Sequence, residues 1–157
     1  MIRTERRMRL CTALVICNLA FIWGNSLLPG TVSGAFSDWV KTLLEGLLPG
    51  GGIQSTGGGL LRKAAHFTEF AALGMCLSWH LGMRGRRPGW ALLWGAAAAW
   101  TDETIQRFVP GRCCSVKDMA IDCAGVLTGM ILLCLGHAYF KGRSGRKSSA
   151  KHTLEDM

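Results

Sequence analysis

The chain has 157 residues, 49% of them apolar, and a formal net charge of +8. This length allows one domain, and a mean hydropathy of +0.24 is high for a small soluble protein. The positive charges lie in clusters between apolar stretches rather than along one face, which argues against nucleic-acid binding and favours a membrane protein.

The seven cysteines do not have the pattern of a disulfide-rich protein. Four of them lie inside apolar stretches: Cys11, Cys17, Cys76 and Cys134. No spacing of cysteine and histidine matches a zinc site. We therefore expect no metal and no cofactor.

The first apolar stretch covers residues 10–28 and follows a basic arm at residues 1–9. A basic start before an apolar run is also typical of a signal peptide. Here the run has about membrane length, roughly 20 residues, and no small-residue cleavage site follows it, which favours a retained membrane helix. Asn18, Asn25 and Ser26 predict that this helix packs against others through polar contacts.

Pro29 and Gly30 end this stretch, and apolar residues then recur at helical spacing from Phe36 to Leu48. Charged residues occupy the opposite side. This pattern predicts an amphipathic helix of about three turns that lies in the membrane interface. A short soluble helix covering the mouth of a bundle is the alternative. Glycine-rich segments at residues 50–52 and 57–59 predict a flexible link.

Three further apolar stretches predict membrane spans at residues 60–83, 90–109 and 118–140. The third span reaches membrane length only if Asp102 and Glu103 lie within the membrane. Residues 141–157 are basic and polar, and we expect a disordered cytoplasmic tail. The folded membrane domain is thus residues 10–140.

The distribution of lysine and arginine predicts the orientation. Of the 18 lysines and arginines, four lie in the basic arm, three in the turn at residues 84–87 and five in the tail. By the positive-inside rule, both termini are cytoplasmic and the chain crosses the membrane four times. The predicted fold is an all-α integral membrane bundle of four transmembrane helices, with the amphipathic helix after the first span.

Ionisable residues gather at the outer ends of three predicted spans. Lys63, His66 and Glu69 recur every third residue, which sets them along one side of a helix. Asp118 and Asp122 share a helical face, and the third span adds further acids. At about 1.5 Å per residue these groups reach a similar shallow depth. Buried carboxylates in lipid are costly unless paired, so we expect ion pairs or a wet cleft.

The candidate ligand-binding residues are Lys63, His66, Glu69, Asp102, Glu103, Gln106, Arg107, Arg112, Ser115, Asp118 and Asp122. His66 and Glu69 are the candidates for catalysis. Structural roles are the alternatives: a helix pair for Glu103 and Arg107, interhelical hydrogen bonds for Gln106 and His66, and a first helical turn capped by Ser115 for Asp118. Gly125 and Gly129 predict close helix packing, within the chain or in an oligomer.

Two segments resemble the motifs of VanZ-like membrane proteins. One is RKAAHFTEFAALG at residues 62–74, and the other runs from Asp102 to Gly129. The resemblance covers roughly residues 10 to 137. The matching positions are Lys63, His66, Glu69, Glu103, Gln106, Arg112, Ser115, Asp118 and Asp122. Family members often have asparagine at the position of Asp122.

The resemblance implies a multi-pass protein of the bacterial plasma membrane that acts at the cell envelope. The founding member of the family is associated with low-level resistance to teicoplanin, a glycopeptide antibiotic with a lipid tail. We therefore expect binding of a lipid-anchored ligand, either the antibiotic or a lipid-linked cell-wall precursor, with membrane lipid as a partner and no nucleic acid.

The alternative is a membrane enzyme that acts on a lipid headgroup. His66 or Glu69 would be the acid-base group, and Lys63, Arg107 or Arg112 would hold phosphate. Two carboxylates and a histidine could then also hold a divalent metal. The sequence contains no lipid phosphatase motif and no serine nucleophile elbow, so we favour binding over catalysis. Transport is a third hypothesis, and it would require an oligomer.

Overall fold

The computed structural model describes residues 2–47 and 57–155. Every regular element in this part of the chain is a helix, as predicted: α1 (Ile2–Ser26), α2 (Gly30–Leu47), α3 (Gly57–Met83), α4 (Gly89–Arg107) and α5 (Val116–Glu155). Most of the predicted glycine-rich link lies outside the described residues.

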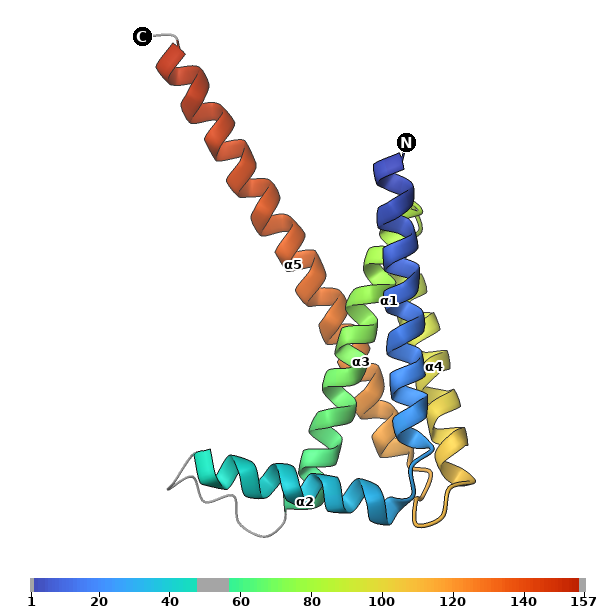
Figure 1. Cartoon of the computed structure of the whole chain (residues 1–157). Coiled ribbons are helices and arrows are strands. Elements are labelled where there is room, and N and C mark those ends of the chain that lie inside the picture. The colour runs from blue at the N-terminus through green and yellow to red at the C-terminus, as the bar shows by residue number, and fades with distance from the viewer. Residues whose placement is uncertain (1, 48–56, 156–157) are drawn as a thin grey trace.

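Four helices form a bundle, and the remaining helix, α2, lies across one end of it (Figure 1). Helices α1, α3, α4 and α5 alternate in direction, with α3 in contact with the other three. Helix α2 crosses the end where α3 and α5 begin, and both chain termini lie toward the opposite end (Figure 1). The arrangement therefore separates two ends: the terminal end, and the end covered by α2.

Several helices extend beyond their predicted bounds. Helix α1 begins at Ile2, so it includes the basic arm, and α2 begins at Gly30, several residues before the predicted amphipathic segment. The prediction of a disordered tail at residues 141–157 is wrong up to Glu155, because α5 continues to that residue. No proline follows Pro110, so nothing in the sequence forces the helix to stop. The C-terminal half of α5 projects away from the bundle (Figure 1).

The tightest helix pair is α3 with α5, and glycines make it possible. A Cβ at Gly125 would crowd the Phe67 carbonyl, and a Cβ at Gly129 would overlap the Ala71 carbonyl. From the other helix, Gly74 fits against the backbone of Val126 in the same way. The prediction of close packing at Gly125 and Gly129 is confirmed, and α3 of the same chain is their partner. An oligomer stays a prediction, since the structure contains one chain.

A second glycine contact joins two connections at the end covered by α2. The backbone N–H of Gly30 donates to the Pro110 carbonyl at 3.1 Å. A Cβ at Gly30 would overlap the Gly111 carbonyl, and Gly111 itself has a φ of +75°, which favours glycine. The α1–α2 connection is thereby fixed against the α4–α5 connection.

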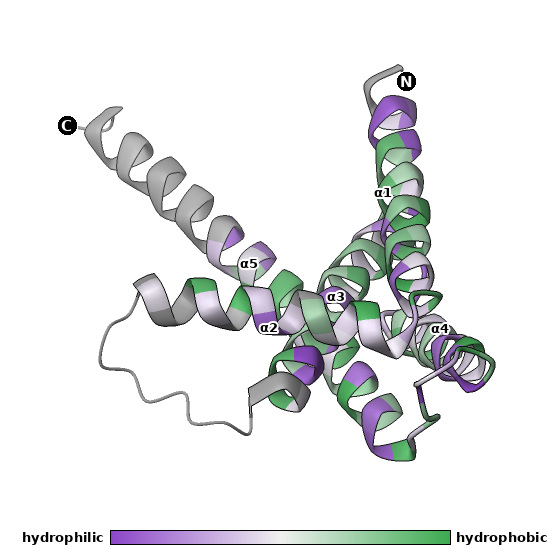
Figure 2. Cartoon of the chain, turned by 60° about the horizontal axis from the view of Figure 1, so that its bottom comes forward, coloured by the Kyte–Doolittle hydropathy of each residue, from purple (hydrophilic) through white to green (hydrophobic). Residues whose placement is uncertain are grey.

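The core is small and the outer surface is apolar. Ile22, Phe70, Leu73 and Val126 are fully buried at the centre of the bundle. Large apolar side chains such as Trp94, at 57% exposure, cover much of the outside. Hydrophobic residues extend along the bundle helices, whereas hydrophilic residues are interspersed with them near the starts of α3 and α5 (Figure 2). An apolar exterior of this kind suits contact with lipid.

Two of the four predicted spans have the length and composition to cross a membrane. They are Thr4–Ser26 in α1 and Val116–Tyr139 in α5. Helices α3 and α4 are not among them; polar residues such as His66, Glu69 and His80 in α3, and Asp102, Glu103 and Gln106 in α4, lower their mean hydropathy. The structure therefore supports membrane-length helices at two of the predicted positions.

The glycine contact between α3 and α5 predicts how a glycine-to-alanine substitution changes the stability of the bundle. Gly129→Ala should lower the free energy of unfolding by about 1–3 kcal/mol, because the added Cβ overlaps the Ala71 carbonyl. Gly136→Ala, on the same helix, meets no atom within 4 Å and should stabilise by up to about 1 kcal/mol through helix propensity. Thermal unfolding in detergent measures both. Equal effects of the two substitutions would contradict the packing.

Candidate functional site

Buried polar side chains gather between the bundle helices at the end covered by α2. They come from every bundle helix and from the α4–α5 connection: Ser26, His66, Asp102, Glu103, Gln106, Arg112 and Asp122. Burial of so many polar groups is expensive unless each finds a partner. We call these seven residues the polar cluster.

Gln106 joins three helices within the polar cluster. It is 1% exposed, and its Nε2 donates to Ser26 Oγ on α1 at 3.1 Å and to Asp102 Oδ2 on α4 at 2.7 Å. Its Oε1 accepts from Arg62 Nη2 on α3 at 2.8 Å. The predicted interhelical role of Gln106 is confirmed, and this residue fixes the positions of its partners.

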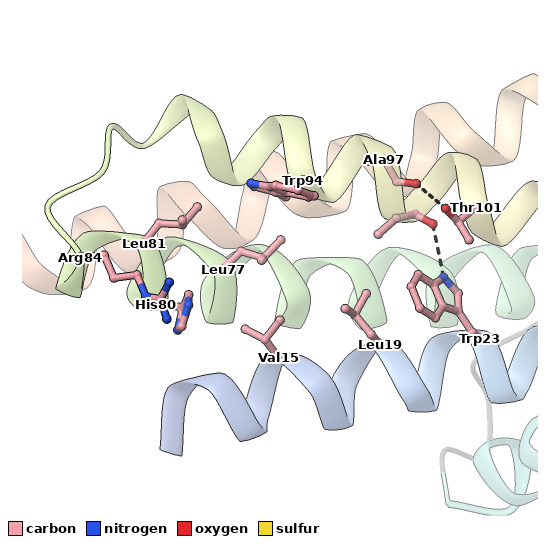
Figure 3. Close-up of a pocket in the computed structure, with 11 residues that line it drawn as sticks. Val15, Leu19, Trp23, Leu77, His80, Leu81, Arg84, Trp94, Ala97 and Thr101 are labelled. Carbon is pink, nitrogen blue, oxygen red and sulfur yellow. Dashed lines mark hydrogen bonds between the residues drawn. The ribbon is translucent and has the colours of Figure 1, made fainter. Parts of the chain in front are cut away.

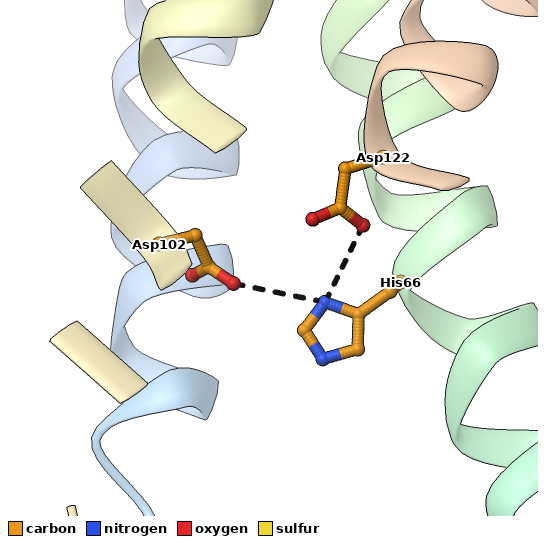
Figure 4. Close-up of side chains that lie close together, drawn as sticks. All are labelled: His66, Asp102 and Asp122. Carbon is orange, nitrogen blue, oxygen red and sulfur yellow. Dashed lines mark ion pairs between the residues drawn. The ribbon is translucent and has the colours of Figure 1, made fainter. Parts of the chain in front are cut away.

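His66 faces two buried carboxylates from different helices. Its Nδ1 lies 3.7 Å from Asp102 Oδ2 on α4 and 3.7 Å from Asp122 Oδ1 on α5. Figure 4 shows the imidazole between the two carboxyl groups. These separations exceed hydrogen-bond length. The three side chains therefore share a space without direct hydrogen bonds between them.

Glu69 and Glu103 each accept a hydrogen bond from another element of the fold. Glu69 Oε1 accepts from Asn25 Nδ2 at 3.0 Å, which links α3 to α1. Glu103 Oε2 accepts from the backbone N–H of Ser115 at 2.7 Å, which links α4 to the start of α5. The helix pair considered for Glu103 and Arg107 is thus replaced by a bond to the backbone of another element.

Arg112 uses its guanidinium to hold the end of α1. Its Nε donates to the Leu28 carbonyl at 2.9 Å, and its Nη2 donates to the Asn25 carbonyl at 3.0 Å. Burial, with a smaller contribution from Arg62, lowers the pKa of Arg112, although nearby carboxylates oppose the shift. An arginine pKa is high enough for the group to stay charged. Arg112 therefore places a positive charge beside the cluster while its hydrogen bonds go to backbone carbonyls.

Several buried atoms of the region have no hydrogen-bond partner. They are His66 Nδ1, Glu69 Oε2, Asp102 Oδ1, Glu103 Oε1 and both carboxyl oxygens of Asp122. Within the described part of the chain, the ion-pair contacts of Asp102 and Asp122 come from His66 alone. Negative charge in the cluster is therefore only partly compensated.

The structure separates the predicted residues into an inner and an outer group. Lys63 and Arg107 are exposed, and Ser115 and Asp118 are half-buried. A helical step of three residues advances about 300°, so Lys63 and Glu69 lie on opposite flanks of the buried His66. Lys63 nevertheless lines a narrow pocket with Arg62, His66 and Asp118. The predicted cap of α5 is present, with the Asp118 backbone N–H donating to Ser115 Oγ at 3.4 Å.

Three residues of this region are missing from the predicted set: Arg62, Asn25 and Ser26. Arg62 lies one turn before His66, so its spacing of four was a usable signal. Asn25 and Ser26 are polar residues at the end of an apolar stretch, which predicts helix contacts but not their partners.

An apolar groove lies between α1, α3 and α4, on the side of the polar cluster toward the terminal end. Its volume is about 470 Å³, and the lining includes Leu19, Trp23, Leu77 and Trp94 (Figure 3). Trp23 Nε1 donates to the Ala98 carbonyl at 3.5 Å at one end of the groove. Thr101, next in sequence to Asp102, also lines it. The groove thus ends close to the polar cluster.

The fold and the site define a class: an all-helical, membrane-associated protein with a charged cluster buried at one end of its bundle. The VanZ/LLP1 family model matches residues 10–137, and the chain belongs to this VanZ-like family. No curated protein and no solved structure matches the chain.

The hydrogen bonds of Gln106 predict that its removal destabilises the bundle. Gln106→Leu should lower the free energy of unfolding by about 1–3 kcal/mol, because Ser26, Asp102 and Arg62 lose their partner. Thr104→Val is the control: Thr104 bonds only to a carbonyl of its own helix, and we expect a change within about 0.5 kcal/mol. Thermal unfolding in detergent distinguishes the two, and an unchanged stability of Gln106→Leu would contradict the network.

Proposed function

We propose that this protein binds the polar headgroup of a lipid-anchored ligand at the polar cluster, on the outer side of the bacterial plasma membrane. The ligand is a lipoglycopeptide antibiotic or a lipid-linked cell-wall precursor, and binding contributes to teicoplanin-type resistance. One observation carries the proposal: buried carboxylate and imidazole atoms converge from three helices and lack partners.

Unpartnered buried polar atoms favour a ligand that supplies the missing contacts. A buried polar group without a hydrogen bond costs about 1–3 kcal/mol, and the cluster contains several such atoms. Lys63 and Asp118 line the narrow pocket that leads to His66. The pocket and the polar cluster together offer cationic, anionic and amide groups to a headgroup that carries phosphate, sugar or peptide.

The apolar groove favours a ligand with a hydrocarbon chain. It lies between α1, α3 and α4 and ends at Thr101, beside Asp102 of the cluster. A chain in this groove would place its headgroup near the polar cluster. We therefore expect the protein to confer more resistance to an antibiotic with a lipid tail than to one without.

The arrangement of the helices favours the four-span topology as part of this proposal. At about 1.5 Å per residue, α3 is about 40 Å long and α4 about 28 Å, close to the thickness of the hydrocarbon core. Both termini lie toward one end of the bundle (Figure 1), and that end carries most of the lysines and arginines. The positive-inside rule then assigns the polar cluster to the extracytoplasmic half.

A second candidate function is chemistry on a lipid headgroup. His66 between two carboxylates supports it, because a carboxylate-oriented imidazole is a common general base. Among the predicted phosphate-binding residues, Lys63 and Arg107 are exposed, and Arg112 bonds backbone carbonyls. This arrangement gives binding the stronger support.

Antibiotic susceptibility tests the proposal. Cells that lack the gene should become more susceptible to teicoplanin, with a smaller change for vancomycin, because only teicoplanin has a lipid tail. Restoring the gene should restore resistance. No selective shift for the lipidated drug would contradict the resistance function.

Variants of His66 and Glu69 test whether these side chains are needed for the resistance phenotype. His66→Ala and Glu69→Gln should each reduce the teicoplanin phenotype, whereas Asp38→Asn, an exposed change on α2, should not. Membrane fractions must contain equal amounts of each variant. Full resistance in His66→Ala and Glu69→Gln would contradict a role for these residues in binding and in catalysis alike.

A further inference from the structure

We propose that His66, Asp102 and Asp122 form a binding site for one divalent transition-metal ion of the kind represented by Mn²⁺ and Zn²⁺. One ligand atom from each residue, the imidazole nitrogen and two carboxylate oxygens, lies within 4.8 Å of the others. The three side chains point toward a common space from α3, α4 and α5 (Figure 4).

The distances between His66 and the two carboxylates fit shared coordination of a metal ion better than direct hydrogen bonds. Metal bonds to nitrogen and oxygen are about 2.0–2.2 Å long, so two donors to one ion lie at most about 4.4 Å apart. His66 Nδ1 is 3.7 Å from each carboxylate oxygen, inside this limit. The two carboxylate oxygens lie within 4.8 Å of each other, so binding one ion requires them to approach by at most about 0.5 Å.

The burial of Asp102 and Asp122 favours binding of a cation between them. Asp102 and Asp122 are 0% exposed, and His66 is 8% exposed. Both oxygens of Asp122, one oxygen of Asp102 and Nδ1 of His66 have no hydrogen-bond partner. The nearby arginines bond other groups: Arg62 the amide of Gln106, and Arg112 two backbone carbonyls. A divalent ion would compensate both buried carboxylates directly.

The donor types indicate the class of metal. Imidazole suits zinc and iron, and carboxylates suit manganese and magnesium, so a mixed set favours an ion between these extremes. Gln106 Nε2 donates to Asp102 Oδ2 at 2.7 Å, the kind of support that orients a ligating carboxylate. The lack of a local Cys/His spacing predicts no metal, but these donors lie on three helices, which no local spacing reveals.

Three protein donors leave coordination positions open for a ligand. The narrow pocket lined by Arg62, Lys63 and Asp118 adjoins His66. A phosphate oxygen of the lipid-anchored ligand would take the open position. Only this last step rests on the proposed function.

Titration of the purified full chain with Mn²⁺ tests the site. Mn²⁺ is the probe because it binds thiols weakly, and the chain has seven cysteines. After removal of metals with EDTA, in detergent and without a polyhistidine tag, loss of the free Mn²⁺ electron paramagnetic resonance signal should show one ion per chain. His66→Gln, Asp102→Asn and Asp122→Asn should each raise the Kd at least about tenfold.

Matched controls keep the result specific. Asp38→Asn and His137→Gln remove an exposed carboxylate and an exposed imidazole elsewhere, and both should retain wild-type binding. Circular dichroism confirms that each variant is folded. No binding by folded wild-type protein, or undiminished binding by Asp122→Asn, would overturn the proposal. Mn²⁺ binding without any teicoplanin phenotype would leave the metal site standing and contradict the proposed function.

Discussion

The close contact between α3 and α5 is the constraint on which the rest of the structure depends. Gly125 and Gly129 allow the two backbones to touch, with Gly125 seated on the Phe67 carbonyl. Phe67 follows His66, and Asp122 lies one turn before Gly125. The glycine contact therefore sets the register that brings His66 opposite Asp122. A helix pair held apart by larger side chains would place these two groups at different depths or at a greater distance.

The second half of the site depends on the connections at the end covered by α2. The Gly30–Pro110 hydrogen bond and the bonds from Arg112 to the end of α1 hold α4 beside α1. Gln106 then reaches Ser26 and orients Asp102 toward His66. Backbone contacts and amide hydrogen bonds thus position ionisable groups whose own charges repel one another. Such a pre-organised, partly compensated cluster favours a function that requires a bound partner.

Much of the fold follows from the sequence, because apolar stretches, prolines and glycines mark the helices and their ends. The shared face of Asp122, Gly125 and Gly129 also follows, since helical spacing alone places them together. The pairing of charges does not follow. Arg62, rather than its neighbour Lys63, hydrogen-bonds to the cluster, and the choice depends on how far α3 is rotated against α1 and α4. Arg112 bonds carbonyls of α1, and no sequence pattern identifies a backbone partner on another helix.

The proposed position of the polar cluster on the outer side of the membrane is tested most directly by the side on which Cys113 and Cys114 react. Both are free and exposed in the α4–α5 connection, next to Arg112. An impermeant thiol reagent should label them in intact cells. A variant with both changed to serine and with Arg86→Cys, in the α3–α4 turn, should react only after lysis. Labelling of Arg86→Cys in intact cells, with Cys113 and Cys114 protected until lysis, would contradict the claim.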